Sequence, residues 1–121
     1  MRDTLHGYLP KTLHIQIPVF IDVSDQAYAL KIECDTMQTN REDVASFHPN
    51  DIIIVDPNRP LRIGSFVIAL LKNTQEVTFK QLVAESGVRY LKPLNPRYQQ
   101  LLLTENVQIC GVIAARYSTF S

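Results

Sequence analysis

Residues 66–83 of the chain read FVIALLKNTQEVTFKQLV, and this stretch decides the fold. It contains two apolar runs, which the polar, turn-forming residues 72–75 separate. Short apolar and β-branched runs bounded by turn residues are typical of buried strands. The stretch therefore predicts a β-hairpin, in which a strand over 66–71 pairs with a strand over 77–84.

The rest of the chain repeats this pattern of short strands and turns. Residues 52–55 are four consecutive β-branched residues, and residues 28–34 alternate between apolar and polar positions. Both patterns are typical of strands. Further strands are predicted over 88–91, 101–103 and 107–115. Turn signals roughly every eight to twelve residues predict a mainly β fold, while Thr39–Glu42 has the form of a capping box and indicates one short helical turn.

The composition limits the class of protein. A chain of 121 residues is long enough for one hydrophobic core and one domain. Hydrophobic residues make up 45% and charged residues 20%, as in globular proteins generally. The 12 basic and 12 acidic residues cancel, whereas a self-sufficient nucleic-acid binder usually has a basic excess. We therefore expect that this chain does not hold DNA by itself.

The cysteines and apolar runs indicate the compartment. Cys34 and Cys110 each lie in an apolar run, which is typical of free, buried thiols in a reducing compartment, with a disulfide between them as the alternative. No signal-peptide pattern begins the chain, and no run approaches the ~18 apolar residues of a membrane span. We expect a cytoplasmic protein without a membrane partner, with an arm or linker remnant over 1–27 and a β domain over 28–121.

Two polar residues carry a candidate chemistry. Thr36 stands where the alternating run 28–34 breaks into a turn, and Lys80 lies within an apolar strand. A hydroxyl nucleophile needs a base within hydrogen-bond reach. The pKa of a free lysine is about 10.4, so a lysine base near neutrality needs a depression of about 3 units, or roughly 4 kcal/mol of desolvation. That demand requires burial, which the apolar neighbours of Lys80 can supply.

Each of these residues also has a plainer interpretation. From the pattern alone, a snorkelling or edge-protecting lysine on a surface strand is the favoured interpretation of Lys80. Thr36 fits a turn-forming or helix-capping threonine after Asp35. Lys72 and Lys92 lie at turn edges and are expected to be exposed.

The order of the segments resembles the C-terminal domain shared by LexA-type repressors, phage CI repressors and UmuD-type proteins, the Ser–Lys self-cleaving peptidases of the S24 family. The resemblance covers about residues 28–115, and its motifs are Cys34-Asp35-Thr36-Met37, Asn50-Asp51, Thr78-Phe79-Lys80-Gln81-Leu82 and Pro93-Leu94-Asn95-Pro96. It implies several curved antiparallel sheets with little helix. It also implies that Thr36 occupies the nucleophile position and Lys80 the general-base position, with Asp35 and Met37 in support.

The chain departs from the family pattern at two points. The family signature reads Gly-Asp-Ser-Met, so Thr36 replaces the nucleophilic serine, and its extra methyl group stiffens χ1 where a substrate must approach. A displacement of about 1 Å can cost roughly 100-fold in rate. Family members cut an Ala-Gly or Cys-Gly bond upstream, but the only Xaa-Gly upstream here is His6-Gly7. Cys110-Gly111 lies in the last predicted strand, where Gly111 is interpreted as a packing or bulge glycine, so the chain either lacks the cleavage loop or does not cleave itself.

The resemblance leads to three hypotheses of function. The first is the dimerisation and regulatory domain of a prophage-type repressor, with a degenerate self-cleavage site and with DNA bound only through an upstream helix-turn-helix domain. The second is an active Thr36/Lys80 autopeptidase, induced in the SOS response by a RecA-like filament. The third is a stand-alone, UmuD-like polymerase accessory protein. A homodimer is expected in this family.

Other kinds of site are not expected. His6, His14 and His48 lack the spacing of metal ligands, and no cysteine pair accompanies them. No cofactor is expected either, because the chain has no glycine-rich phosphate loop. Asp51 and Asp56 are interpreted as turn and cap residues.

Overall fold

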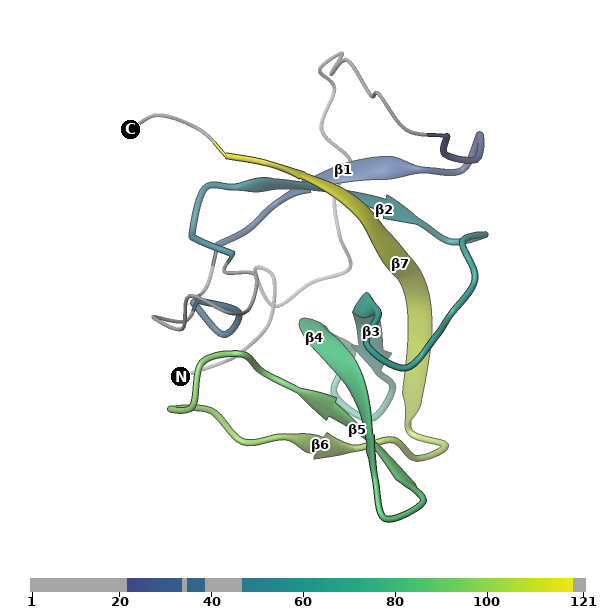
Figure 1. The fold of residues 1–121 in the computed structure, drawn as a ribbon, viewed down its shortest axis with the longest axis vertical. Coiled ribbons are helices and arrows are strands. Elements are labelled where there is room, and N and C mark those ends of the chain that lie inside the picture. Colours follow the sequence, from purple (N-terminus) through teal and green to yellow (C-terminus); the bar gives the residue numbers. More distant parts are fainter. Residues whose placement is uncertain (1–21, 34, 39–46, 119–121) are drawn as a thin grey trace.

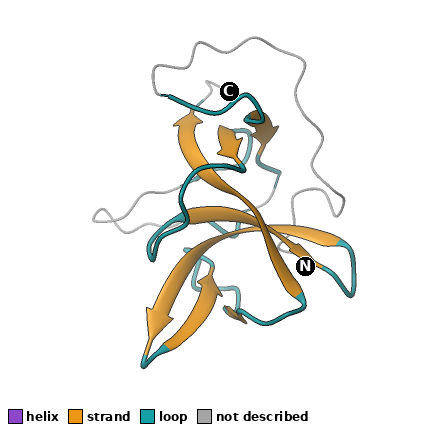
Figure 2. Cartoon of the chain, turned by 90° about the vertical axis from the view of Figure 1, so that its right-hand side faces the viewer, coloured by secondary structure: helices purple, strands orange, loops and turns teal. Residues whose placement is uncertain are grey.

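The structure is a computed structural model that describes residues 22–33, 35–38 and 47–118. The strands that they form are β1 Tyr28–Lys31, β2 Ile52–Asp56, β3 Phe66–Leu71, β4 Glu76–Glu85, β5 Val88–Lys92, β6 Leu101–Leu102 and β7 Val107–Tyr117. Turns and loops make up the remainder of these residues (Figure 2). The prediction of a mainly β fold is confirmed. No helix among the described residues is long and apolar enough to cross a membrane.

The seven strands join into one sheet in the order β1-β2-β7-β3-β4-β5-β6, and every pair is antiparallel. β7 joins the two halves, because residues 112–117 pair with β2 and residues 107–112 pair with β3. Figure 1 shows β7 running from the end of the molecule that holds β5 and β6 toward the β1–β2 pair. The register of β7 shifts against each partner strand, and such bulges bend a sheet. The several curved sheets that the resemblance implied are therefore hydrogen-bonded into one bent sheet.

Gly111 allows β7 to pass close to the end of β2. A Cβ atom at this position would lie 2.6 Å from Cγ1 of Val55 and 3.3 Å from the backbone nitrogen of Pro57. Carbon atoms in contact normally lie about 3.5–4.0 Å apart, so the interpretation of Gly111 as a packing glycine is confirmed. The neighbouring Cys110 has a free thiol that is half-buried instead of fully buried.

The hairpin predicted from residues 66–83 is confirmed. β3 pairs with β4 from Leu71 opposite Glu76 to Phe66 opposite Gln81. The other predicted strands are present as β1, β2, β5, β6 and β7, with ends that differ by one or more residues. Cys34 and the helical turn predicted at Thr39–Glu42 lie outside the described residues.

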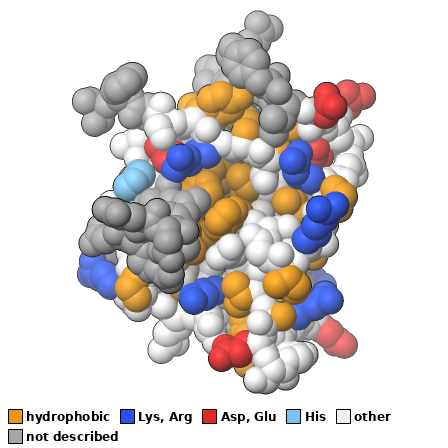
Figure 3. Space-filling view, viewed as in Figure 1, with side chains coloured by type: hydrophobic (Ala, Val, Ile, Leu, Met, Phe, Trp, Pro, Cys, Tyr) orange, Lys and Arg blue, Asp and Glu red, His pale blue; other side chains and the backbone are white. Residues whose placement is uncertain are grey.

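Two hydrophobic clusters lie on opposite faces of the strands that they share. The first cluster consists of Leu30, Ile32, Met37, Phe47, Ile53, Val55, Ile68, Val77 and Phe79. The second cluster consists of Val67, Ala69, Leu82, Leu91 and Val112, with Leu101, Leu103, Val107 and Ile109 packed against it in partly buried positions. Figure 3 shows hydrophobic side chains gathered in the middle of one face of the molecule, with Lys and Arg side chains around them.

Candidate functional site

Thr36 lies in a tight turn that follows β1. The amide of Gln38 donates to the carbonyl oxygen of Asp35 at 3.1 Å and closes the turn. Aspartate is favoured at the first position of such a turn, because its side chain bonds nearby backbone groups. Thr36 itself is fully buried, and Met37 packs in the first cluster. The corner predicted at Asp35-Thr36-Met37 is therefore present, with Thr36 and Met37 buried and Asp35 half-buried.

A loop after β5, residues 93–98, holds this turn. The amide of Asn95 donates to the carbonyl oxygen of Thr36 at 2.8 Å, and Nδ2 of Asn95 donates to the carbonyl oxygen of Asp35 at 3.0 Å. The hydroxyl of Tyr98 donates to Oδ1 of Asp35 at 2.5 Å. Three donors from the 93–98 loop thus converge on two consecutive residues of the turn.

The chain that leads into the turn is held by the start of β2. The amide of Ile32 donates to the carbonyl oxygen of Asp51 at 2.9 Å, and the amide of Asn50 donates back to Ile32 at 2.8 Å. Asn50 has a φ of 77°, a left-handed conformation in which asparagine is enriched among non-glycine residues. The buried Asp51 carboxylate accepts a hydrogen bond from the amide of His48 at 3.0 Å. Asp51 is thus a turn residue, as its sequence context predicted.

Lys80 lies in the middle of β4 and is fully buried. Successive residues of a strand point to opposite faces, so Phe79 faces the first cluster and Lys80 shares its face with Leu82 of the second cluster. Nζ of Lys80 donates to Oγ1 of Thr78 at 2.6 Å. The apolar context of Lys80 in the sequence correctly predicted burial, and its interpretation as an exposed edge lysine is wrong.

The Thr36 turn and Lys80 are connected through β5 and the 93–98 loop. Gln81 follows Lys80 in β4 and lies opposite Lys92, the last residue of β5. Asn95, which holds Thr36, comes three residues after Lys92, and three Cα steps of about 3.8 Å span no more than about 11 Å. Among the described residues, every buried side-chain nitrogen or oxygen has a hydrogen-bond partner. A buried hydroxyl and a buried amine are the groups that base-assisted nucleophilic attack requires, provided that they lie within hydrogen-bond reach.

Comparison with known proteins identifies the family. Residues 4–114 match the Peptidase S24-like family. The chain belongs to this family. The S24 resemblance inferred from the motifs is therefore confirmed.

The S24-like chain is similar to three regulators. It is 41% identical over 86 residues to the HTH-type transcriptional regulator for conjugative element SXT of Vibrio cholerae. It is 34% identical over 98 residues to the prophage repressor CohE of Escherichia coli. It is 30% identical over 101 residues to the LexA repressor of Carboxydothermus hydrogenoformans. These alignments cover 71%, 79% and 82% of this chain but only 40%, 41% and 46% of the three relatives. The S24-like chain thus spans less than half the length of these curated relatives.

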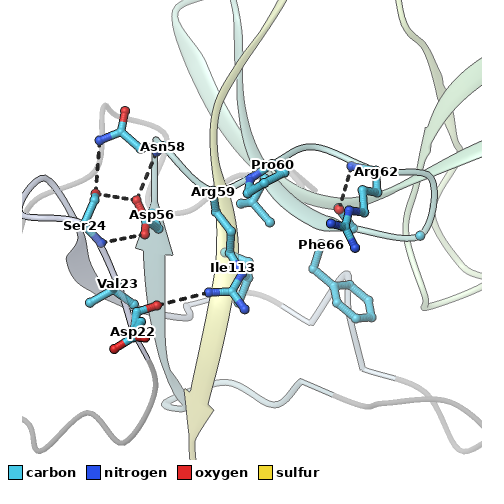
Figure 4. Close-up of a pocket in the computed structure, with 13 residues that line it drawn as sticks. Asp22, Val23, Ser24, Asp56, Asn58, Arg59, Pro60, Arg62, Phe66 and Ile113 are labelled. Atoms are coloured by element: carbon cyan, nitrogen blue, oxygen red, sulfur yellow. Dashed lines mark hydrogen bonds between the residues drawn. The ribbon is translucent and has the colours of Figure 1, made fainter.

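An open groove of about 570 Å³ lies elsewhere on the S24-like domain, between residues 22–24, the β2–β3 loop and β7 (Figure 4). Neither Thr36 nor Lys80 lines it. Two arginines, Arg59 and Arg62, lie along it together with apolar side chains from β3 and β7. The groove is therefore separate from the pair of residues that the family resemblance picks out.

Asp56, at one end of this groove, fastens the segment before β1 to the end of β2. The amide and the hydroxyl of Ser24 donate to the two carboxylate oxygens of Asp56 at 2.8 and 2.5 Å, and the amide of Asn58 donates at 3.0 Å. The pKa of Asp56 lies below its ordinary value, chiefly because of the hydrogen bonds from Ser24. The hydrogen bond from Asn58 and the charge of Arg59 lower it further. The sequence predicted a turn residue here, but it held no signal for a partner 32 positions away.

Asn95 and Tyr98 are the residues near the site that sequence reasoning left without a role. The signal was present in part, because Pro93-Leu94-Asn95-Pro96 was among the motifs of the resemblance. Asparagine and proline are common in any loop, so composition alone does not reveal that this loop reaches the Thr36 turn.

Proposed function

We propose that this chain is the dimerisation and regulatory domain of a prophage-type transcriptional repressor. The observation that carries the proposal is the character of its relatives, which include a transcriptional regulator of a conjugative element and a prophage repressor. The alignment covers 40% of the SXT regulator, which leaves most of that protein for other parts. The zero net charge of this chain supports an arrangement in which an upstream helix-turn-helix domain binds the DNA.

The domain would act in such a repressor by pairing. Two DNA-binding domains joined through a dimer contact two half-sites together, so the second contact becomes intramolecular and the effective concentration rises. The edge of the second cluster is suited to a dimer surface, because Leu101, Val107 and Ile109 pack against the cluster but are only partly buried. Apolar side chains left at a surface in this way favour association.

Sedimentation equilibrium tests the pairing. We expect the domain to dimerise, and we expect Ile109→Asp to shift it to monomer, because a charge would be buried in the interface. Ile63→Asp is the matched control, since Ile63 is 54% exposed and lies outside both clusters. A wild-type domain that remains monomeric, or an Ile63→Asp variant that dissociates equally, contradicts this use of the surface.

At the candidate site, Thr36 occupies the nucleophile position and Lys80 the general-base position, in a form that the threonine makes slow or inactive. In the working reaction, neutral Lys80 takes the hydroxyl proton while Oγ1 of Thr36 attacks a peptide carbonyl carbon. The C–N bond breaks, the proton passes to the leaving amine, and water then hydrolyses the ester. The extra methyl group stiffens Thr36 in a fully buried position, where close packing resists adjustment.

Self-cleavage is tested on the full-length protein at about pH 7 and about pH 10, with fragments identified by intact mass. Alkaline pH deprotonates a lysine base without an inducer. We expect no specific cut in the wild type, a cut in Thr36→Ser, and its loss when Lys80→Met is added. A wild-type cut that disappears in both Thr36→Ala and Lys80→Ala would instead establish the active autopeptidase. A RecA-like filament added near pH 7 then tests whether an inducer replaces alkaline pH.

Tyr28 limits how alkaline this assay can be. Burial, and secondarily Cys110, raise the pKa of Tyr28 to about 12. A phenol of this kind stabilises the fold below its unfolded pKa of about 10, and that contribution is lost as the pH rises through the folded value. The incubation therefore stays at or below about pH 10, and circular dichroism checks that the domain remains folded.

A further inference from the structure

Asn95 and Tyr98 belong to a segment that the proposed function does not use. The 93–98 loop carries one of the four motifs of the resemblance, and its donors reach the Thr36 turn. We propose that Asn95 and Tyr98 are positioning residues that fix the Thr36 turn against the strand that carries Lys80. This inference rests on the proposed assignment of Thr36 and Lys80 as the reacting pair.

Asn95 bonds in both directions, to its own loop and to the turn. It is buried, with 8% of its surface exposed. Its Oδ1 accepts the amide of Arg97 at 3.0 Å, while its Nδ2 donates to the carbonyl oxygen of Asp35, 60 positions away in sequence. A side chain with one donor group and one acceptor group is needed for this bridge, and an aspartate would keep only the acceptor.

Tyr98 adds a bond to the side chain of the same turn residue. Its hydroxyl donates to the carboxylate of Asp35, 63 positions away. Hydrogen bonds to a charged acceptor are stronger than those between neutral groups. The amide of Tyr98 donates to the carbonyl oxygen of Asn95 at 3.2 Å, so the two residues lie in one hydrogen-bonded turn. The turn is therefore fixed by its backbone through Asn95 and by its side chain through Tyr98.

The 93–98 loop is itself tied to β4. It leaves β5 at Lys92, which lies opposite the residue that follows Lys80. Pro93 is buried and has a restricted φ, and Leu94 packs against the first cluster. Only a short, well-packed segment therefore separates the β4–β5 ladder from the bonds to the turn. A change in that segment would shift the Thr36 hydroxyl relative to Lys80, and a shift of about 1 Å is enough to cost roughly 100-fold in rate.

A thiol placed at position 36 reports this geometry without requiring cleavage. The background carries Thr36→Cys with Cys34→Ser and Cys110→Ala, so that one thiol remains. Its ionisation is followed by thiolate ultraviolet absorbance against pH. Adding Lys80→Met then measures how strongly Lys80 acts on the thiol. We expect the pKa of the thiol to rise by about 1 unit or more, because a charged or hydrogen-bonding neighbour that favours the thiolate has been removed.

The loop variants are compared on this background. In Tyr98→Phe and in Asn95→Asp, we expect the shift in thiol pKa that Lys80→Met produces to fall to less than half of its value in the starting background. Tyr90→Phe is the matched control, because Tyr90 is a half-buried tyrosine on β5 whose strand partners are Val83 and Leu102. It should keep the full shift. Thermal unfolding of each variant separates a change in position from a general loss of structure.

The outcomes distinguish the inference from the proposed function. If Lys80→Met leaves the thiol unchanged in the starting background, Thr36 and Lys80 are not a pair, and the site assignment and the positioning role both fail. If the thiol pKa shifts in the starting background and shifts equally in Tyr98→Phe and Asn95→Asp, the pairing of Thr36 and Lys80 stands and the positioning role alone is overturned. The positioning role is likewise overturned if these variants lower thermal stability but keep the full shift.

Discussion

The two hydrophobic clusters share β3 and β4 but differ in construction. The first is larger and aromatic: Phe47 packs edge-on against Phe66 and Phe79, with 4.9 Å between ring centroids in each pair. The second is smaller and its buried members are aliphatic, and partly buried apolar side chains pack against both clusters. Lys80, a buried ionisable residue, shares the face of the second cluster, whereas its neighbour Phe79 belongs to the first.

Under the proposed function, the two faces of the sheet have different tasks. Burial of large apolar side chains supplies most of the stability of a small domain, so the first cluster carries the fold. A buried lysine needs hydrogen-bond partners and loses hydration, which makes it a poor contributor to stability. Under the proposed function, the second face would carry the Lys80 chemistry and the contact between two domains.

Truncation within each cluster gives the sharpest test of this comparison. We expect Phe79→Ala to lower the free energy of unfolding by about 3–5 kcal/mol, because it removes a large side chain from between packed aromatic rings. Leu82→Ala should cost about 2–3 kcal/mol, because the side chain that it removes is smaller. Urea unfolding of both variants measures the difference, and equal losses would mean that the second cluster is as important to stability as the first.

Gly111 is the point where β7 passes between the two halves of the sheet. We expect Gly111→Ala to cost about 1–3 kcal/mol, because its Cβ would collide with Val55 of the first cluster. Gly87→Ala is the contrasting variant, since Gly87 has a φ of 79° but no atom within 4 Å of the position that a Cβ atom would take. Its cost should come from backbone strain alone, about 1–2 kcal/mol. Chemical denaturation should detect a clash only at Gly111, seen as partial recovery of stability when Val55→Ala is added.

Lys80→Met separates stability from chemistry on the second face. Methionine keeps the length of the side chain and removes the buried amine, so we expect the free energy of unfolding to stay level or rise by up to about 2 kcal/mol. Any cleavage in the Thr36→Ser background should be lost. A variant that unfolds easily would show that Lys80 is a structural residue, and it would weaken the assignment of this face to chemistry.

The smallest expected effect is a dependence on pH at Asp56, beside Val55 of the first cluster. Its lowered pKa means that it stabilises the fold above the unfolded value of about 3.9 and that this contribution is lost as the pH falls through the lower, folded value. The melting temperatures of the wild type and Asp56→Asn should therefore differ near neutrality and converge in acid. Asp25→Asn, at an exposed neighbouring position, is the control. A constant difference across pH would contradict the role of the Asp56 carboxylate.

Local patterns predicted much of the fold. The 66–83 hairpin followed from two apolar runs and a polar turn, and the burial of Lys80 followed from its apolar neighbours. Lys72 and Lys92, which lie at turn edges, are exposed as expected. These features depend on residues close together in sequence, where strand periodicity and turn chemistry act directly.

The features that sequence reasoning missed are long-range. The bond from Asn95 to Asp35 spans 60 positions, and the anchor from Ser24 to Asp56 spans 32. Joining of all the strands into one sheet depends on which edges of β2 and β3 meet β7, and no local pattern specifies that choice. The roles of Thr36 and Lys80 came from family resemblance and not from spacing, so they remain predictions for the cleavage and thiol experiments.

β7 is the last of the seven strands to leave the ribosome, and it is the strand that both halves of the sheet require. Synthesis adds about 5–20 residues per second, so β1–β2 and β3–β6 emerge while their inner edges still lack a partner. Unpaired edges of this kind are prone to aggregation. The two halves can close into one sheet only after residues 107–117 have emerged, which makes the nascent chain most vulnerable just before its last strand appears.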